Sequence, residues 1–172
     1  AAGTPILDFK YKDGWYGITD GGGFSLTLLD SSTPDLTRWS DKDSWASSTV
    51  PGGTPGQADT GPKPGDIVIN EILAHSDTVA YDWIELYNTT NTSIDIGGWF
   101  LSDTNSDDPN LMKYEIADGV TIGGHSYKMF YENLHFGWSS SDPGRHVPFA
   151  LSENGEEVCL TLADGGVLGG YR

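Results

Sequence analysis

The sequence contains a single cysteine, Cys159, among its 172 residues. One thiol cannot form an intramolecular disulfide, and no cysteine and histidine spacing typical of a zinc site is present. Cys159 lies in the segment EVCLTL, on the strand face opposite Val158 and Leu160. We therefore expect a small, half-buried residue at this position. The cysteine content leaves the cellular compartment open.

Basic residues are also scarce, with 9 lysines and arginines against 25 aspartates and glutamates, a formal net charge of −16. Phosphate backbones and anionic lipids attract basic proteins. The composition therefore predicts neither a nucleic acid partner nor a membrane partner. The simplest consequence of the excess is solubility through surface repulsion. Binding of divalent cations and adaptation to high salt are the functional alternatives.

Long hydrophobic runs and catalytic motifs are absent. No run approaches the roughly 20 apolar residues of a membrane span. The residues after Ala1 lack the pattern of a secretory signal, so we expect a mature or trimmed chain. Nucleophile-elbow, phosphate-loop and His-Glu-x-x-His motifs are all missing. Glu71 and Glu85, on neighbouring predicted strands, have the residue types of a glycosidase pair, but ordinary polar contacts explain them as well. We predict that the chain is not an enzyme.

Glycine, proline and aromatic residues are plentiful instead. The chain has 23 glycines and 9 prolines, and aromatic residues make up 12% of it. Spread without a repeat, they fit many short strands joined by tight turns. Residues 67–73 and 83–87 alternate with the period of two that is typical of β-strands. The sequence therefore predicts an all-β protein.

Several motifs that follow residue 66 form a recognisable series. INEI is followed by DWIELYN, a short Ile-Asp-Ile strand and GGWFLSD, and the series continues with IADGVTIGGHSYKMF and FALSENGEEVCLTLADGG. Together these motifs resemble the lamin tail domain family over residues 66–168. The resemblance implies an immunoglobulin-like β-sandwich of the kind found at the ends of nuclear lamins and in secreted bacterial proteins. It also implies a non-catalytic module that is extracellular or on the cell surface.

The alternation of residues within the predicted strands identifies a hydrophobic core for this sandwich. The predicted core residues are Ile69 or Val68, Ile72, Ile84, Leu86, Trp99, Leu101, Leu160 and Leu162.

The chain is expected to divide into three parts. Residues 66–172 form the sandwich, and residues 51–65, rich in proline and glycine, form a linker. Residues 1–50 hold predicted strands at 6–11 and 24–29, followed by a loop with Trp39 and Trp45. In this part, Asp-Gly-Gly-Gly, Ser-Leu-x-Leu and a closing Gly-Thr-Pro-Gly resemble the end of a lamin-tail-like repeat, and we expect it to pack on the sandwich.

The segment that resembles the end of a lamin-tail-like repeat precedes the sandwich, whereas in the family it follows this region. This order suggests that the sandwich lacks one strand where it ends, at Arg172. An unpaired sheet edge is an aggregation hazard. We hypothesise that the strands at 6–11 and 24–29 supply the missing pairing, within one chain or by strand-swapped self-association. The simpler alternative is that residues 1–50 are a loosely attached fragment.

The abundance of aromatic residues bears on function, because exposed rings stack on sugar faces and anchor protein interfaces. Trp15, Tyr16, Tyr131 and Trp138 lie in or beside predicted turns and are the candidate ligand-binding residues. Such rings also cap the ends of sandwich cores. The sequence favours a binding or structural module that engages a protein or a carbohydrate. The alternative is a carbohydrate-binding accessory domain of a secreted hydrolase.

A calcium site is the only cofactor that the sequence suggests. Asp103, Asn105 and Asp107 match the first three ligand positions of an EF-hand loop, but Asp108 replaces its glycine and Tyr114 its bidentate glutamate. An EF-hand is therefore excluded. A looser calcium site and a plain solvated turn remain the alternatives. Among the histidines, only His135 and His146 are expected to approach each other, which is too few ligands for a metal site.

Overall fold

The computed structural model describes residues 3–32, 35–74, 81–104, 110–164 and 167–168. The chain forms two compact units, Ala1–Lys63 and Pro64–Arg172, called unit 1 and unit 2 below. Within these ranges every strand pairing is antiparallel, apart from one isolated parallel bridge between Pro64 and Ile67. The only helical segments in the described ranges are short 3-10 turns and one π-turn, and none has the length and apolarity to cross a bilayer. The all-β prediction is confirmed.

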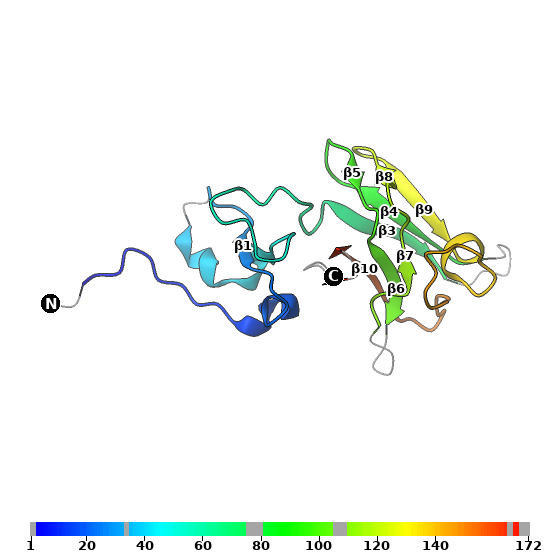
Figure 1. Cartoon of the computed structure of the whole chain (residues 1–172), viewed down its shortest axis with the longest axis horizontal. Helices are drawn as coiled ribbons and strands as arrows, with labels where there is room; N and C mark the ends of the chain where they lie inside the picture. Colours follow the sequence, from blue (N-terminus) through cyan, green and yellow to red (C-terminus); the bar gives the residue numbers. More distant parts are fainter. Residues whose placement is uncertain (1–2, 33–34, 75–80, 105–109, 165–166, 169–172) are drawn as a thin grey trace. The chain divides into compact units, whose positions relative to one another are not determined.

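Unit 2 is built mainly from two three-stranded sheets (Figure 1). The first has the strand order β3–β4–β9, with bounds Ile67–Leu73, Trp83–Asn88 and Tyr127–Tyr131. The second has the order β10–β6–β7, with bounds Glu157–Thr161, Phe100–Thr104 and Tyr114–Glu115. Two short pairs complete the unit: β5 (Ile94–Asp95) with β8 (Thr121–Ile122), and β11 (Ala163–Asp164) with β12 (Val167–Leu168).

The hydrophobic core of unit 2 draws side chains from both of these sheets. Ile84 and Leu86 of β4 and Leu101 of β6 are fully buried in one cluster, together with Trp99 and Leu162. These five predicted core residues are confirmed. Ile69 and Leu160 are half-buried and pack against the same cluster. The alternation read from the sequence therefore assigned the correct faces to most of these strands.

Ile72 is the exception, because 46% of its surface is exposed. The pairing of β3 with β4 shifts register between Ile69 and Glu71, which makes Asn70 the extra residue of a β-bulge. Ile72 therefore lies opposite Ile84, on the core face. It remains exposed because it sits near the end of an edge strand, where it has a neighbouring strand on one side only.

Unit 1 has little regular structure. Its strands β1 (Leu26–Leu28) and β2 (Trp45–Ser47) pair with each other. The remaining elements are 3-10 turns: η1 (Asp13–Trp15), η2 (Gly17–Thr19), η3 (Leu36–Ser40) and η4 (Lys42–Ser44). Asp35 and Asp41 cap the last two turns, since their side chains accept hydrogen bonds from nearby backbone N–H groups. Such local bonds compete with the backbone pairing of a β-sheet.

The strand predicted at residues 6–11 is wrong. This segment has no β-ladder, and Ile6 is fully exposed. Its backbone binds a side chain instead, because Lys10 N–H donates to Ser40 Oγ at 3.1 Å. Phe9 stacks on Trp45 at 5.2 Å between ring centroids and meets Trp39 edge-on. Aromatic packing, without strand pairing, holds this part of unit 1.

The segment predicted as a linker is hydrogen-bonded into unit 1 over part of its length. Gly52 N–H donates to Gly23 carbonyl oxygen at 2.7 Å. Asp59 accepts the backbone N–H of Thr49 at 2.9 Å and also its hydroxyl. The boundary between the two units falls after Lys63.

Candidate functional site

The outward side of sheet β3–β4–β9 carries an unusual concentration of aromatic side chains. Residues directly opposite each other in an antiparallel pair share a face. Ile84, Leu86 and Phe130 point into the core, so the alternate positions point outward. Those outward positions, called the aromatic face below, hold Val68, Glu71, Leu73, Trp83, Glu85, Tyr87, Tyr127, Met129 and Tyr131.

The pairing of β4 with β9 arranges this face in three rows. Trp83 lies opposite Tyr131 at one end, and Tyr87 lies opposite Tyr127 at the other. Between these two aromatic pairs lies the row of Glu85. The four-residue separation along a strand places the two pairs roughly 13 Å apart.

Tyr87 and Tyr127 form the better defined of the two pairs. Their ring centroids are 4.6 Å apart with a 30° tilt, and Tyr127 is 56% exposed. Tyr87 hydroxyl lies 3.3 Å from His125 Nδ1, and His125 Nε2 lies 2.6 Å from Asn91 Oδ1. The result is a connected cluster of three rings and an amide at one end of the face.

The backbone that positions His125 has unusual requirements. His125 has a φ of +52°, the only positive φ of a non-glycine residue in the described ranges. Such left-handed positions cost of order 1–3 kcal/mol and cluster at functional sites. A Cβ on the preceding Gly124 would lie 2.5 Å from the Asn91 backbone. Gly124 thus allows the turn that carries His125 to contact the turn that carries Asn91. His125 N–H donates to the carbonyl oxygen of Thr90 in that second turn.

Buried Asn88 holds the opposing turn in place. Its Nδ2 donates to the carbonyl oxygens of Thr92 and Ile122 at 2.8 Å, and its Oδ1 accepts the N–H of Thr90. Because a buried amide needs these partners, the turn that carries Asn91 is fixed relative to β8. The cluster around Tyr87 is therefore built on a rigid base.

The Trp83 and Tyr131 end is supported by the π-turn η5 (Glu132–Phe136). His135 Nδ1 accepts the backbone N–H of Tyr131 at 2.8 Å, and the two rings stack at 6.4 Å. Burial lowers the pKa of His135 below its usual value of 6.5. His135 Nδ1 also lies 3.2 Å from the carbonyl oxygen of Tyr131, and the backbone hydrogen bond with Tyr131 opposes the larger effect of burial on this pKa.

Comparison with protein-family models gives a match to the Lamin Tail Domain over residues 60–171. This match covers well over half of the chain. The chain belongs to the lamin tail domain family. Its fold is the immunoglobulin-like β-sandwich of that family, which confirms the fold predicted from the sequence. No curated protein and no solved structure matches the chain.

The lamin tail domain is a non-catalytic family, and no catalytic domain is identified in this chain. Glu71 and Glu85, the two carboxylates with the residue types of a glycosidase pair, lie opposite each other on the aromatic face. Glu85 Oε1 accepts Asn70 Nδ2 at 2.7 Å. The bulge at Asn70 thus fixes the orientation of a carboxylate between the two aromatic pairs.

The four aromatic residues selected from the sequence lie in both units. Tyr131 belongs to the aromatic face of the lamin tail domain. Trp138 is 65% exposed beyond η5, and its carbonyl oxygen accepts Arg145 Nη1 at 2.8 Å. Trp15 and Tyr16 belong to unit 1. A binding role for these four residues stays a prediction.

Tyr16 has a structural role within unit 1. Its hydroxyl donates to Trp45 carbonyl oxygen at 2.8 Å, and Lys42 Nζ lies 4.9 Å from the centre of its ring. Burial, with a smaller effect from Asp43, raises the pKa of Tyr16. Tyr16 therefore ties η1 and η2 to strand β2.

The aromatic face contains residues that the selection from sequence missed, chiefly Tyr87, Tyr127 and Trp83. A signal was present, because Trp83, Glu85 and Tyr87 alternate with the buried Ile84 and Leu86. Aromatic residues at outward positions of a strand leave the core and face the surface. The candidates named from the sequence lie in or beside predicted turns, so aromatic residues within the strands were missed.

The predicted calcium ligands are only partly described. Asn105 and Asp107 lie outside the described residues. Asp103 Oδ1 accepts Lys113 Nζ at 2.6 Å, and both side chains are largely buried. In the described ranges, no cluster of three or more histidine, cysteine or acidic residues has the arrangement of a metal site. The calcium site stays a prediction, which melting curves with and without EDTA would check.

The two histidines expected to approach each other have separate partners. His146 Nε2 lies 2.9 Å from Glu115 Oε2, and its ring stacks on Phe100 at 5.9 Å. His135 contacts Tyr131 instead. These contacts give each ring a structural role.

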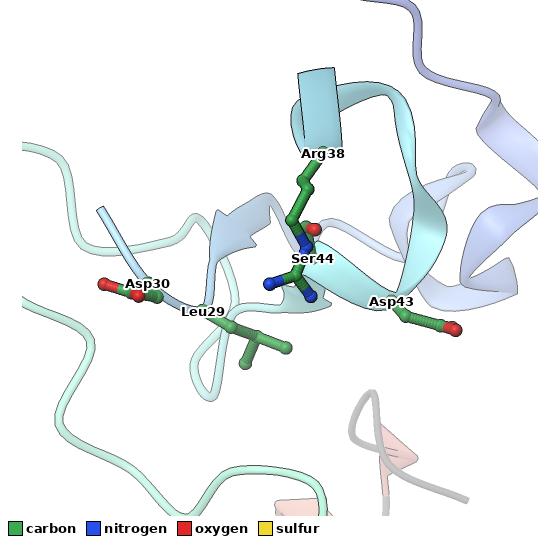
Figure 2. A pocket seen from close by; sticks show the side chains of 5 residues that line it. All are labelled: Leu29, Asp30, Arg38, Asp43 and Ser44. Atoms are coloured by element: carbon green, nitrogen blue, oxygen red, sulfur yellow. The ribbon is translucent and has the colours of Figure 1, made fainter. Parts of the chain in front are cut away.

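Unit 1 contains a small pocket lined by Leu29, Asp30, Arg38, Asp43 and Ser44. Figure 2 shows Arg38 extending from η3 toward Ser44, while the carboxylates of Asp30 and Asp43 point away. The pocket volume is about 70 Å³, well below the 300–1,000 Å³ of typical ligand pockets. It is too small to enclose an organic ligand, so the aromatic face is the stronger candidate for recognition.

Proposed function

We propose that this chain is a non-catalytic binding module of an exported multidomain protein, and that its ligand binds on the aromatic face. The observation that carries the proposal is the set of outward rings on β4 and β9, with Tyr127 more than half exposed. Contiguous exposed apolar surface with polar neighbours is characteristic of interaction sites. Tyrosine, tryptophan and methionine are the residues enriched there.

The construction of the face also supports a role in binding. Its rings project from a three-stranded sheet whose opposite side is the hydrophobic core. A rigid scaffold reduces the entropy lost when a ligand orders surface side chains. The strained position of His125 and the buried Asn88 add to this preorganisation.

The proposed location is extracellular or at the cell surface, in a protein of bacterial type. The similarity of the INEI and DWIELYN motifs to secreted bacterial modules supports this location. The low content of basic residues agrees with partners other than nucleic acid and membranes. Fractionation of the source cells tests it, since an antiserum against the chain should detect the protein in the medium or on intact cells.

The binding function is tested by removing two rings of the face. The double variant Tyr87→Ala, Tyr127→Ala is compared with Tyr11→Ala, which removes an exposed tyrosine of unit 1 that is neither part of the face nor a candidate ligand-binding residue. Immobilised proteins are screened against a glycan array and an extracellular protein extract. We expect a ligand that binds the native chain and Tyr11→Ala but not the double variant. Equal retention of every ligand by the double variant would contradict the proposal.

A carbohydrate-binding accessory domain of a secreted hydrolase is the second candidate. Two aromatic pairs with a carboxylate between them favour it, because rings stack on sugar faces and carboxylates accept hydroxyl groups. In that case, fusing the chain to a hydrolase should raise the activity of the hydrolase on insoluble polysaccharide but not on a soluble substrate.

A further inference from the structure

The charges on the aromatic face restrict its ligand. On the described strands β3, β4 and β9, the only charged outward residues are Glu71 and Glu85. The one lysine in these strands, Lys128, lies opposite the buried Leu86 and so points to the core side. An anionic ligand would therefore meet like charge and no compensating cation. The face suits a neutral or cationic ligand that donates hydrogen bonds.

The edges of the sheet argue against an added peptide strand. The bulge at Asn70 interrupts β3, which is one edge. On β9, the other edge, Lys128 points inward. Bulges and inward-pointing charges are two of the devices that keep further strands from pairing with a sheet. Recognition by strand addition is therefore disfavoured, and a ligand has to lie across the face.

The rings and the polar groups alternate along the face in a way that matches a sugar chain. A pyranose ring presents C–H groups on its faces and hydroxyl groups around its rim. Tyr127 and Tyr131 offer exposed rings roughly 13 Å apart on one strand. Glu85, held by Asn70, offers acceptor oxygens between them, and Asn91 adds an amide at the His125 end.

We infer that the ligand of the aromatic face is a neutral, extended oligosaccharide that contacts both aromatic pairs. This inference rests on the proposed function. Sugar rings stack on the Tyr127 and Tyr131 ends, and hydroxyl groups in between donate to Glu85. A flat protein partner would instead bury Glu71 and Glu85, which is costly unless it supplies cations. A sugar chain leaves those carboxylates partly hydrated.

The test is NMR titration of the whole chain at millimolar ligand. The probes are neutral hexasaccharides of cellulose, xylan and mannan, the matching disaccharides, acidic oligogalacturonate, and oligolysine as a cationic peptide. We expect at least one neutral hexasaccharide to shift the backbone signals of Tyr87, Tyr127 and Tyr131. The matching disaccharide should bind more weakly, because it reaches only one aromatic pair. Oligogalacturonate should not shift the NMR signals of the face.

Variants separate stacking from folding effects. Tyr127→Ala should weaken binding of the hexasaccharide about tenfold or more, as expected for an aromatic anchor. Tyr127→Phe keeps the ring and should bind nearly as the native chain does. Tyr11→Ala, at an exposed tyrosine of unit 1, is the matched control and should leave the affinity unchanged. Tyr127→Ala binding with native affinity would overturn the assignment.

The outcomes distinguish this inference from the proposed function. If oligolysine or oligogalacturonate shifts the NMR signals of the face and no neutral sugar does, the inference of a neutral oligosaccharide is wrong, but the face remains a binding site. If no neutral sugar shifts the NMR signals of the face, and the double variant of Tyr87 and Tyr127 also retains every ligand found by screening, both proposals fail. Equal affinity for disaccharide and hexasaccharide would overturn the extended ligand.

Discussion

Trp99 closes a turn that only glycine permits. Gly98 has a φ of +76°, and a Cβ on Gly97 would lie 2.8 Å from the backbone nitrogen of Gly119. Trp99 N–H donates to Ile96 carbonyl oxygen, and only 6% of the side chain is exposed. The glycine pair therefore directs a large ring into the core of the lamin tail domain.

Replacing Trp99 with alanine should lower the free energy of unfolding by about 3–5 kcal/mol, the range for large aromatic residues removed from a core. Urea unfolding measures the change. Trp138→Ala, at an exposed ring, is the control and should change stability by less than about 0.5 kcal/mol. A loss below about 1 kcal/mol for Trp99→Ala would mean that this residue is not part of the core.

His135 should make stability depend on pH. Its pKa is lowered in the folded state, chiefly by burial, so the unfolded chain binds a proton first as pH falls. Stability is then fully present above the unfolded value of 6.5 and is lost as pH falls toward the folded pKa. Urea unfolding of the native chain and His135→Gln at pH 7.5 and 5.5 measures this. The variant should lose less stability between the two values, and an identical loss in both proteins would contradict the role of His135.

At the scale of elements, the alternation of residues was sufficient to predict which side chains of the central strand β4 face the core. Both neighbours of β4 are strands, and one of its faces is buried. It was insufficient for β3. The bulge depends on one residue, Asn70, whose side chain finds its partner Glu85 on the next strand. A contact of this kind is not visible in a single strand. The burial expected for Ile72 failed for a different reason, because alternation does not show that β3 is an edge strand.

Unit 1 shows a second limit. Residues 6–11 have the composition of a strand, but a strand also needs a partner. In the structure Phe9 packs against Trp39 and Trp45, which are about thirty residues away in sequence. The candidate site was limited in the same way, since the cluster around Tyr87 joins two turns whose contact depends on Gly124.

Deleting Asn70 should be tolerated. On both sides of this residue, β3 already pairs with consecutive residues of β4, so the deletion removes the bulge without changing which residues face the core. The expected cost is about 1 kcal/mol, the value of the lost hydrogen bond to Glu85. Deleting Glu85 from the unbulged strand β4 is the control. It shifts Ile84 or Leu86 to the outer face and should cost about 2–5 kcal/mol. Equal costs for the two deletions would argue against the bulge.

At the scale of the whole molecule, the role of residues 1–50 stays a prediction. Strand β1 pairs with β2 inside unit 1, and β10 lies at the edge of its sheet in unit 2. If residues 1–50 complete the sandwich, within the chain or between chains, a chain of residues 61–172 should be less stable and prone to associate. Thermal melting and analytical ultracentrifugation measure both. A shortened chain that is soluble, monomeric and equally stable would contradict the hypothesis.

The single cysteine gives this molecule a built-in reporter. Cys159 lies on β10 with only 4% of its surface exposed, opposite Ser102 of β6. A thiol reagent can reach it only when β10 separates from its neighbour, so the rate of labelling measures the free energy of that local opening. A second cysteine introduced on the exposed aromatic face would react much faster. A dye could therefore be attached there selectively, without first removing the natural thiol.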